Sequence, residues 1–393
     1  MRIVLTGGGT GGHVTPLVAI AGVLRRWDAE GKLPALTADD HALEMLYVGV
    51  VSDMDRRGLE EAGIPYRHIP SGKIRRYLSG AHLTAVDVVC RLPVGILRAV
   101  WTLFVLMPDV IFSKGGYGAV PVMIAAWVYR IPFLLHETDS VPGLANQRFA
   151  RFASAIAVGF PDAEKAFPPK KTFTVGTPLR PAFSSLPSPE AARQRLGLHD
   201  RKPVIFVTGG SQGAQRLNTV LLANVTRLLP EAQILHQVGE QNLAAVNAFV
   251  QKDLAQFPDI QDYHMIGFLS EQDMALSFAA ADLIISRAGG TTLAEIAAAG
   301  KPSVLIPLRE AAQQHQWENA YFFRERGAAA VLDESNLTPS VFHTTISRLL
   351  SNPQDLRVMA ERVRSLHRPN AAEDLARILL EMAHGRLPQR ALA

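Results

Sequence analysis

The stretch from Leu5 to Pro16 reads LTGGGTGGHVTP and lies between two apolar runs. The run at residues 3–5 is short and continuous, as in a buried parallel strand, and the run from Leu17 onward has helical spacing. Glycine accepts positive φ and lets a ligand approach the backbone, and a helix N-terminus attracts anions. A strand, a glycine turn and a helix start in this order therefore predict a site for an anionic group. His13, at the end of the turn, is either a titratable group of that site or a histidine buried beside a tight turn.

The composition is that of a large globular chain. Its 393 residues are enough for two domains of about 100–200 residues each. Hydrophobic residues make up 48% and charged residues 19%, which excludes a disordered chain. The net charge of +4 is far below that of a nucleic-acid-binding tail, but it is compatible with an anionic ligand or a membrane surface. We therefore expect no nucleic-acid partner.

The sequence favours a cytoplasmic location. Its single cysteine, Cys90, excludes an internal disulfide and a cysteine metal cluster and fits a reducing compartment. The N-terminal apolar run ends at Thr6-Gly7 after three residues, so we expect no signal peptide. The most apolar stretch, residues 99–107, is roughly half of the ~20 residues that a bilayer requires. We therefore expect no membrane-spanning helix.

Short apolar runs alternate with helical stretches along most of the chain. Runs without polar alternation indicate strands that are covered on both faces, so we predict an α/β fold with doubly wound parallel sheets. The predicted strands cover residues 3–5, 45–51, 110–113, 133–136, 155–158, 172–175, 204–208, 233–237, 263–266, 283–286, 303–307 and 329–332.

A repeat divides the chain. VIFVTGGSQG at residues 204–213 resembles IVLTGGGTGG at residues 3–12, which predicts two similar domains. Between them, the proline-rich stretch predicts a linker. We expect an N-terminal domain at 1–178, a linker at 179–202, a C-terminal domain at 203–369, and a last helix at about 370–388 that returns to the first domain.

Two more glycine turns follow predicted strands. The turn at residues 115–118 comes after the strand at 110–113, so it is expected at the same sheet edge as the first turn. The turn SRAGGTT at residues 286–292 enters a helix that Thr291 or Thr292 can cap. This turn is either only a capped helix or a phosphate site, with Glu295 one turn further on as acceptor for a ribose diol.

Two polar segments have two interpretations each. QQHQWEN at residues 313–319 is either a polar helix start or a set of amides that bind sugar hydroxyls. HETDS at residues 136–140 either lines a ligand site or forms a turn. We discount a metal site there, because adjacent side chains at a strand end point to opposite faces.

A basic and apolar stretch follows residue 72. Apolar side chains, including Trp101, are interspersed with Lys73, Arg75, Arg76, Arg91 and Arg98. Such a stretch is either a patch that docks on anionic lipid head groups or a buried helix whose arginines extend into water.

Seven motifs occur in the order found in one family. They are GGGTGGHVTP, SKGGYGAVP, HETDSVPGLANQ, GTPLR, TGGSQGAQRLN, SRAGGTTLAEIAAAGKPSVLIPL and HQWENA. The motifs resemble those of the MurG family of glycosyltransferases, which is glycosyltransferase family 28. The resemblance implies a GT-B fold, in which two Rossmann-like domains face each other across a cleft. It implies inverting transfer of N-acetylglucosamine from UDP to the 4-hydroxyl of the muramyl sugar of lipid I, which forms lipid II for peptidoglycan synthesis.

The resemblance also implies partners and a location. The C-terminal domain would bind UDP-N-acetylglucosamine, and the N-terminal domain would bind lipid I at the cytoplasmic face of the cell membrane. Other proteins of cell-wall synthesis are candidate partners. No metal or other cofactor is expected, because glycine turns and helix dipoles hold the diphosphate in this fold.

Individual residues match the family's site positions. Thr10, Gly11 and Gly12 would border the transferred sugar and the acceptor diphosphate. His13 would be the general base, since an imidazole with an ordinary pKa of about 6.5 can take a proton from an alcohol, and Glu137 is the competing candidate. The implied donor contacts are Glu295 for the ribose, Thr292 and Ser211 for phosphate, Arg180 and Leu269 for uracil, and Gln316 and Asn319 for the sugar. The other implied substrate-binding residues are Asp139, Gly290, Thr291, Leu293, Ala294 and His315.

The chain departs from the family in three places. Thr138-Asp139 stands where the family usually has Gln-Asn, and the Asp139 anion would repel two diphosphates unless a cation or proton intervenes. His315 stands where other polar residues are common, and residues 28–44 lengthen the first crossover. The alternatives are a related transferase with another lipid acceptor such as diacylglycerol, a nucleotide-binding protein without catalysis, and a GT-B epimerase.

Overall fold

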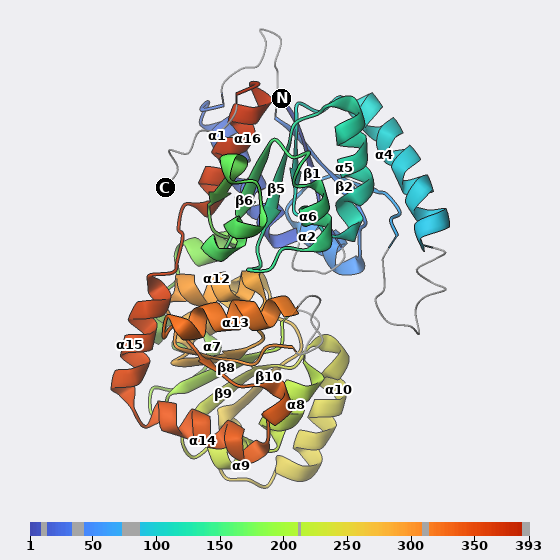
Figure 1. The fold of residues 1–393 in the computed structure, drawn as a ribbon. Coiled ribbons are helices and arrows are strands. Elements are labelled where there is room, and N and C mark those ends of the chain that lie inside the picture. Colours follow the sequence, from blue (N-terminus) through green and yellow to red (C-terminus); the bar gives the residue numbers. More distant parts are fainter. Residues whose placement is uncertain (9–13, 34–42, 73–86, 211–213, 309–313, 387–393) are drawn as a thin grey trace. The chain divides into compact units, whose positions relative to one another are not determined.

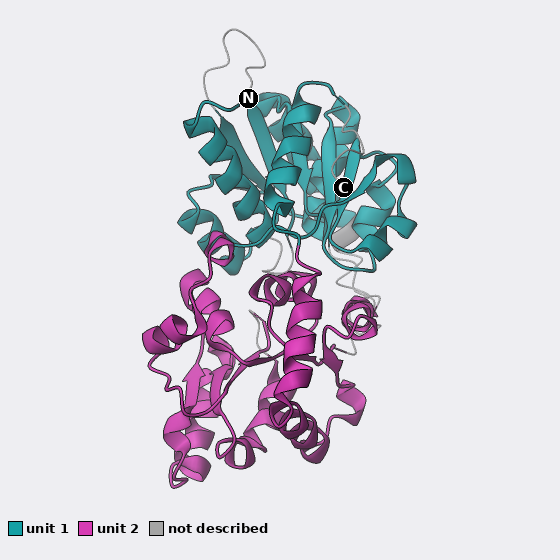
Figure 2. Ribbon diagram, turned by 90° about the vertical axis from the view of Figure 1, so that its left-hand side faces the viewer, with its two compact units in different colours: residues 1–180, 368–393 teal, residues 181–367 magenta. Residues whose placement is uncertain are grey.

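The computed structural model describes residues 1–8, 14–33, 43–72, 87–210, 214–308 and 314–386. The chain forms two compact units, one from residues 1–180 and 368–393 and the other from residues 181–367 (Figure 2). Each unit contains one parallel β-sheet with helices, so the prediction of two Rossmann-like α/β domains is confirmed.

The first unit contains a seven-stranded parallel sheet in the order β3-β2-β1-β4-β5-β6-β7. The order reverses direction between β1 and β4, so the carboxyl ends of these two strands flank the position where such sheets bind ligands. The strands are β1 (Arg2–Thr6), β2 (Glu44–Gly49), β3 (Tyr66–His68), β4 (Val110–Ser113), β5 (Phe133–Glu137), β6 (Ala155–Val158) and β7 (Thr172–Thr174). The helices are α1 (Val14–Ala29), α2 (Asp53–Glu61), α4 (Leu92–Leu106), α5 (Val120–Tyr129), α6 (Leu144–Phe149) and α16 (Ala371–Ala383).

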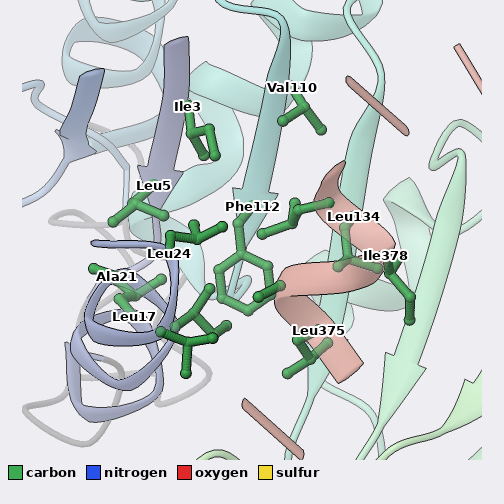
Figure 3. Packing of buried hydrophobic residues seen from close by; sticks show 14 of the residues in the cluster. Ile3, Leu5, Leu17, Ala21, Leu24, Val110, Phe112, Leu134, Leu375 and Ile378 are labelled. Atoms are coloured by element: carbon green, nitrogen blue, oxygen red, sulfur yellow. The ribbon is translucent and has the colours of Figure 1, made fainter. Parts of the chain in front are cut away.

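Both faces of this sheet are buried. Helices α1 and α16 cover one face, where the Phe112 ring lies among leucines of α1, β5 and α16 (Figure 3). Helices α4 and α5 cover the other face, where Ala99 and Leu103 pack with Ile111. Full burial of a large apolar side chain contributes about 1.5–3 kcal/mol, which explains why the strands have continuous apolar sequences.

The second unit repeats this plan with six parallel strands in the order β10-β9-β8-β11-β12-β13, and its order reverses between β8 and β11. The strands are β8 (Val204–Thr208), β9 (Gln233–Gln237), β10 (Tyr263–Ile266), β11 (Leu283–Ser286), β12 (Ser303–Leu305) and β13 (Ala330–Val331). The helices are α7 (Pro189–Leu196), α8 (Gln215–Leu222), α9 (Val225–Leu228), α10 (Glu240–Phe249), α11 (Glu271–Ala280), α12 (Gly290–Ala299), α13 (His315–Glu325), α14 (Pro339–Leu350) and α15 (Pro353–Arg364).

Residues 179–202, which we expected to be a linker, contain helix α7 instead. Ser188 caps this helix by accepting a hydrogen bond from the Ala191 amide, and Pro189 is its first residue. Proline is favourable at that position because its missing N–H would have no helical partner there. Ala192 is fully buried with residues of α11. The prolines here therefore mark the start of a packed helix.

Helix α4 corrects another expectation. The helical segment Val89–Leu106 has 18 residues and a mean hydropathy of 1.7, long and apolar enough to cross a membrane by length and composition. The apolar run that we expected to be roughly half as long as a bilayer requires is thus part of a longer helical segment, which continues through Arg91 and Arg98, while the absence of a membrane-spanning helix stays a prediction. Only 22% of the segment is buried, and one of its faces packs beside α5 (Figure 1).

Candidate functional site

Most residues predicted from the sequence fall into three groups, while Arg91, Arg98 and Trp101 lie on the helical segment Val89–Leu106 and Arg180 lies between β7 and α7. One group lies at the strand ends of the first unit and another at the strand ends of the second. The third group lies outside the described residues and comprises Thr10, Gly11, Gly12, His13, Lys73, Arg75, Arg76 and Ser211.

In the first unit, two glycine turns meet where the strand order reverses. Thr6 and Ser113 are register partners at the carboxyl ends of β1 and β4. A Cβ atom on Gly118 would lie 2.7 Å from the carbonyl oxygen of Gly7, so the second turn touches the first. This contact confirms the expectation that both turns share one sheet edge. Gly115, with a φ of +75°, adopts the left-handed conformation that glycine favours.

Glu137 organises the loop that follows β5. Its Oε1 accepts a hydrogen bond from the Asp139 amide at 3.1 Å, and its Oε2 accepts from the Gly143 amide and Asn146 Nδ2, both at 2.9 Å. The side chain is 5% exposed. Burial raises the pKa of this carboxyl, and repulsion from Asp139 raises it further. Its contacts are those of a residue that holds the loop, while a role as the competing general base stays a prediction.

A buried lysine lies beside this loop and was not singled out from the sequence. Lys114 is 3% exposed, and its Nζ donates a hydrogen bond to Thr138 Oγ1 at 2.8 Å. Burial lowers the pKa of its ammonium, while attraction to Glu137 and Asp139 opposes that shift. The residue belongs to the SKGGYG motif, so the signal was a charged residue directly after a buried strand.

His136 is structural in this unit. It is fully buried, and its Nε2 lies 2.9 Å from the Gly176 carbonyl oxygen. Burial holds the pKa of the imidazole well below its ordinary value. The ring is therefore neutral, and Nε2–H donates to the carbonyl. His136 thus ties the end of β5 to the turn after β7.

In the second unit, helix α12 begins directly after β11 and offers an anion site. Gly289 is the N-cap and makes no side-chain cap hydrogen bond, and the first turn contains no acidic residue. The expectation that Thr291 or Thr292 caps the helix was wrong, because the helix starts at Gly290 and both threonines lie inside its first turn. A helix N-terminus of this kind attracts a phosphate through its amides and its dipole.

Glu295 follows one turn into α12. It is 3% exposed, whereas Thr291 and Thr292 are half-buried. Residues three and four apart lie on one face of a helix, so both threonines share a face with Glu295. Leu293 is fully buried and anchors the helix in the unit's core, while Ala294 is half-buried.

Helix α13 holds the loop in front of α12. Asn319 is fully buried, and its Nδ2 donates a hydrogen bond to the Ala288 carbonyl at 3.0 Å. Gln316 Oε1 accepts from the Leu308 amide at 2.9 Å. His315 is the first residue of the helix and is half-buried. These amides therefore organise the turns at the ends of β11 and β12, and their predicted contacts to a sugar stay predictions.

The two residues expected at the uracil have different exposures. Arg180 is half-buried in the first unit, and the Leu269 side chain is only 3% exposed in the second. Leu269 would therefore reach a base through its backbone. The neighbouring Phe268 was not singled out from the sequence and is 52% exposed.

A buried network joins α8 to β9 and β10. His236 Nδ1 lies 2.7 Å from the Tyr263 hydroxyl, and its Nε2 lies 3.0 Å from Asn218 Oδ1. Burial lowers the pKa of His236 to about 3, so the ring is neutral and donates from Nε2. Asn218 in turn donates to the Val238 carbonyl, which joins α8 to the end of β9.

Both units thus have the parallel sheet of the Rossmann type, with glycine turns and polar residues at the carboxyl ends of its strands. Two family models match the chain, the N-terminal domain of glycosyltransferase family 28 at residues 3–158 and the C-terminal domain of the same family at residues 204–375. The chain belongs to this family and is a glycosyltransferase.

The chain is also similar to individual proteins whose names state what they do. The UDP-N-acetylglucosamine–N-acetylmuramyl-(pentapeptide) pyrophosphoryl-undecaprenol N-acetylglucosamine transferase of Symbiobacterium thermophilum is 35% identical, over 98% of this chain and 96% of that protein. The crystal structure of MurG from Acinetobacter baumannii is 29% identical, with a TM-score of 0.71, over 96% of this chain and 99% of that chain. The UDP-GlcNAc 2-epimerase of Neisseria meningitidis, 13% identical with a TM-score of 0.64 over 97% and 100% of the two chains, shares the fold alone.

Proposed function

We propose that this chain transfers N-acetylglucosamine from UDP-N-acetylglucosamine to the 4-hydroxyl of the muramyl sugar of lipid I and so forms lipid II for peptidoglycan synthesis. The observation that carries the proposal is the 35% identity to a relative of that name over 98% of the chain. A different acceptor, such as diacylglycerol, is the alternative.

The donor would bind in the second unit. The N-terminus of α12, which has no acidic residue in its first turn, would receive the diphosphate. Glu295 would accept hydrogen bonds from the two ribose hydroxyls, since a buried carboxylate accepts strongly. In this proposal the helix dipole and the backbone amides hold the leaving group, and no metal is required.

The acceptor would bind in the first unit. Its 4-hydroxyl oxygen attacks C1 of the donor sugar from the face opposite the diphosphate, the bond from C1 to the UDP oxygen breaks, and the anomeric centre is inverted. The hydroxyl proton passes to the imidazole of His13, the proposed general base. Negative charge builds up on the departing UDP, where the positive end of α12 stabilises it.

The outer face of α4 would bind the membrane in which a lipid acceptor resides. Leu97 is 71% exposed, Trp101 67% and Phe104 54%. They lie on one stripe of the helix, because they are separated by four and three residues. Arg91 and Arg98 are exposed beside this stripe and suit anionic head groups. The protein would thus be peripheral at the cytoplasmic face of the membrane, with α4 lying in the interface.

A transfer assay tests the proposal. Labelled UDP-N-acetylglucosamine is offered with a lipid I analogue and, separately, with diacylglycerol. We expect labelled product only from the lipid I analogue. Product from diacylglycerol would replace the proposal with the alternative. Conversion of the sugar nucleotide without any acceptor would indicate an epimerase, and nucleotide binding without conversion in either mixture would indicate a protein without catalysis.

A further inference from the structure

A buried cation lies at the carboxyl ends of β4 and β5, beside the loop that begins at Thr138. Lys114 donates a hydrogen bond to Thr138 Oγ1 at 2.8 Å, and Asp139 follows in the same loop. Lys114 and Thr138 are only 3% and 8% exposed. The threonine is thus in contact with the ammonium group, and the aspartate that follows it attracts that group.

Without the ammonium of Lys114, the negative charges of Glu137 and Asp139 would have no positive charge to offset them. Glu137 and Asp139 both attract its ammonium, and they repel each other. Burial and the nearby positive charge of Lys114 both lower the pKa of the His136 imidazole, so the ring is neutral. These three titratable groups interact with Lys114. One cation therefore faces two carboxylates that would otherwise be close and uncompensated.

Glu137 is the residue that needs this compensation. It accepts hydrogen bonds from the Asp139 amide, the Gly143 amide and Asn146 Nδ2. A carboxylate accepts such bonds about twice as strongly as a neutral group does, so the anion holds the loop more firmly than the acid would, while burial and Asp139 oppose its ionisation.

We propose that Lys114 is a positioning residue, which offsets the charge of Asp139 so that Glu137 stays ionised and holds the loop at residues 138–143. In this proposal the three residues act together, and they are Lys114, Thr138 and Asp139. The ammonium supplies the cation that an aspartate at this sheet edge requires. The effect of this set on acceptor use rests on the proposed function, but its effect on folding does not.

The stability of the protein should reveal this role through its pH dependence. The pKa of Glu137 is raised in the folded state, because burial and Asp139 make its ionisation costly there. Its contribution to stability is therefore complete below the ordinary value of 4.5, where the group is protonated, and it falls as the pH rises through the folded value. Lys114 limits that loss by attracting the carboxylate. In Lys114→Met the loss should increase, so the difference in Tm from the wild type should widen between pH 4.5 and neutral pH.

Two further variants make the test specific. Lys114→Met combined with Asp139→Asn removes both the cation and the repelling anion, so its pH dependence should return toward that of the wild type. Lys171→Met is the control, because Lys171 Nζ donates to the carbonyls of Arg151 and Ala153 and the pKa of Lys171 is lowered by burial alone. This control should change Tm equally at both pH values.

The experiment measures thermal unfolding of the full chain at the two pH values and kcat/KM with a lipid I analogue. We expect Lys114→Met to reduce kcat/KM about tenfold or more with unchanged UDP affinity, and the double variant to recover most of it. A Tm difference independent of pH, or a double variant no better than the single one, would overturn the inference. If Lys114→Met does not fold, a folded double variant supports the inference and an unfolded one contradicts it. Wild-type protein that is inactive on lipid I would refute the proposed function while leaving the unfolding result intact.

Discussion

Replacing Leu97 and Trp101 with serine tests whether the outer face of α4 binds membrane. The two side chains are one helical turn apart, and they are 71% and 67% exposed. Full burial of a large apolar side chain contributes about 1.5–3 kcal/mol, so about two-thirds of that gives roughly 1–2 kcal/mol for each residue and 2–4 kcal/mol for the pair. Since about 1.4 kcal/mol corresponds to a tenfold change, the partition coefficient onto vesicles should fall roughly 30- to 700-fold.

The assay is co-sedimentation with vesicles that contain an anionic phospholipid, at several lipid concentrations. The matched control replaces Tyr321 and Val341 with serine, since these side chains are 42% and 43% exposed in the second unit. The control should bind vesicles like the wild type. If the α4 variant also partitions like the wild type, α4 does not bind lipid and the membrane proposal fails.

Three other substitutions test the two sites. Glu295→Ala should weaken UDP-N-acetylglucosamine binding roughly 10- to 150-fold, because hydrogen bonds to a charged group contribute about 1.5–3 kcal/mol, and equal affinity by calorimetry would contradict the ribose assignment. Gly115→Ala should lower Tm and activity together, because the new Cβ would lie 2.1 Å from Asn146 Oδ1 at a φ of +75°. Gly197→Ala is its control, since Gly197 has a similar φ of +70° but no atom within 4 Å of the added Cβ, so an equal loss in both variants would show that backbone strain alone acts. His13→Ala should reduce turnover about 100-fold or more while UDP binding is retained, and unchanged turnover would refute the assignment of the general base.

Strands buried on both faces could be predicted from the sequence almost to the residue. The expected bounds 110–113, 155–158 and 233–237 match β4, β6 and β9, because a continuous apolar run has one favourable place in such a sheet. Strand β3 (Tyr66–His68) was missed, because it pairs only with β2 and its half-buried to exposed side chains leave no apolar run. Exposed edges are thus the part of a sheet that hydrophobic patterns cannot reveal.

The positions of the sites could also be predicted, but their internal contacts could not. Glycine turns after apolar runs indicated the strand ends, since parallel strands carry ligands there. The hydrogen bond from Asn319 to Ala288 joins residues 31 apart, and that from Lys114 to Thr138 joins residues 24 apart. No local spacing rule indicates such pairs, because they depend on which strand ends the topology makes neighbours.

The sequence TGG occurs in both units, and the two sheets reverse their strand order in the same way. The two sites nevertheless differ in charge. The one that begins α12 has no acidic residue in its first turn and suits an anionic diphosphate. The one at β4 and β5 contains two carboxylates and one buried ammonium. A site of that kind would repel a second diphosphate if it lost its cation. The charge balance around Lys114 therefore distinguishes the site of the first unit from that of the second, whereas a glycine turn is common to both.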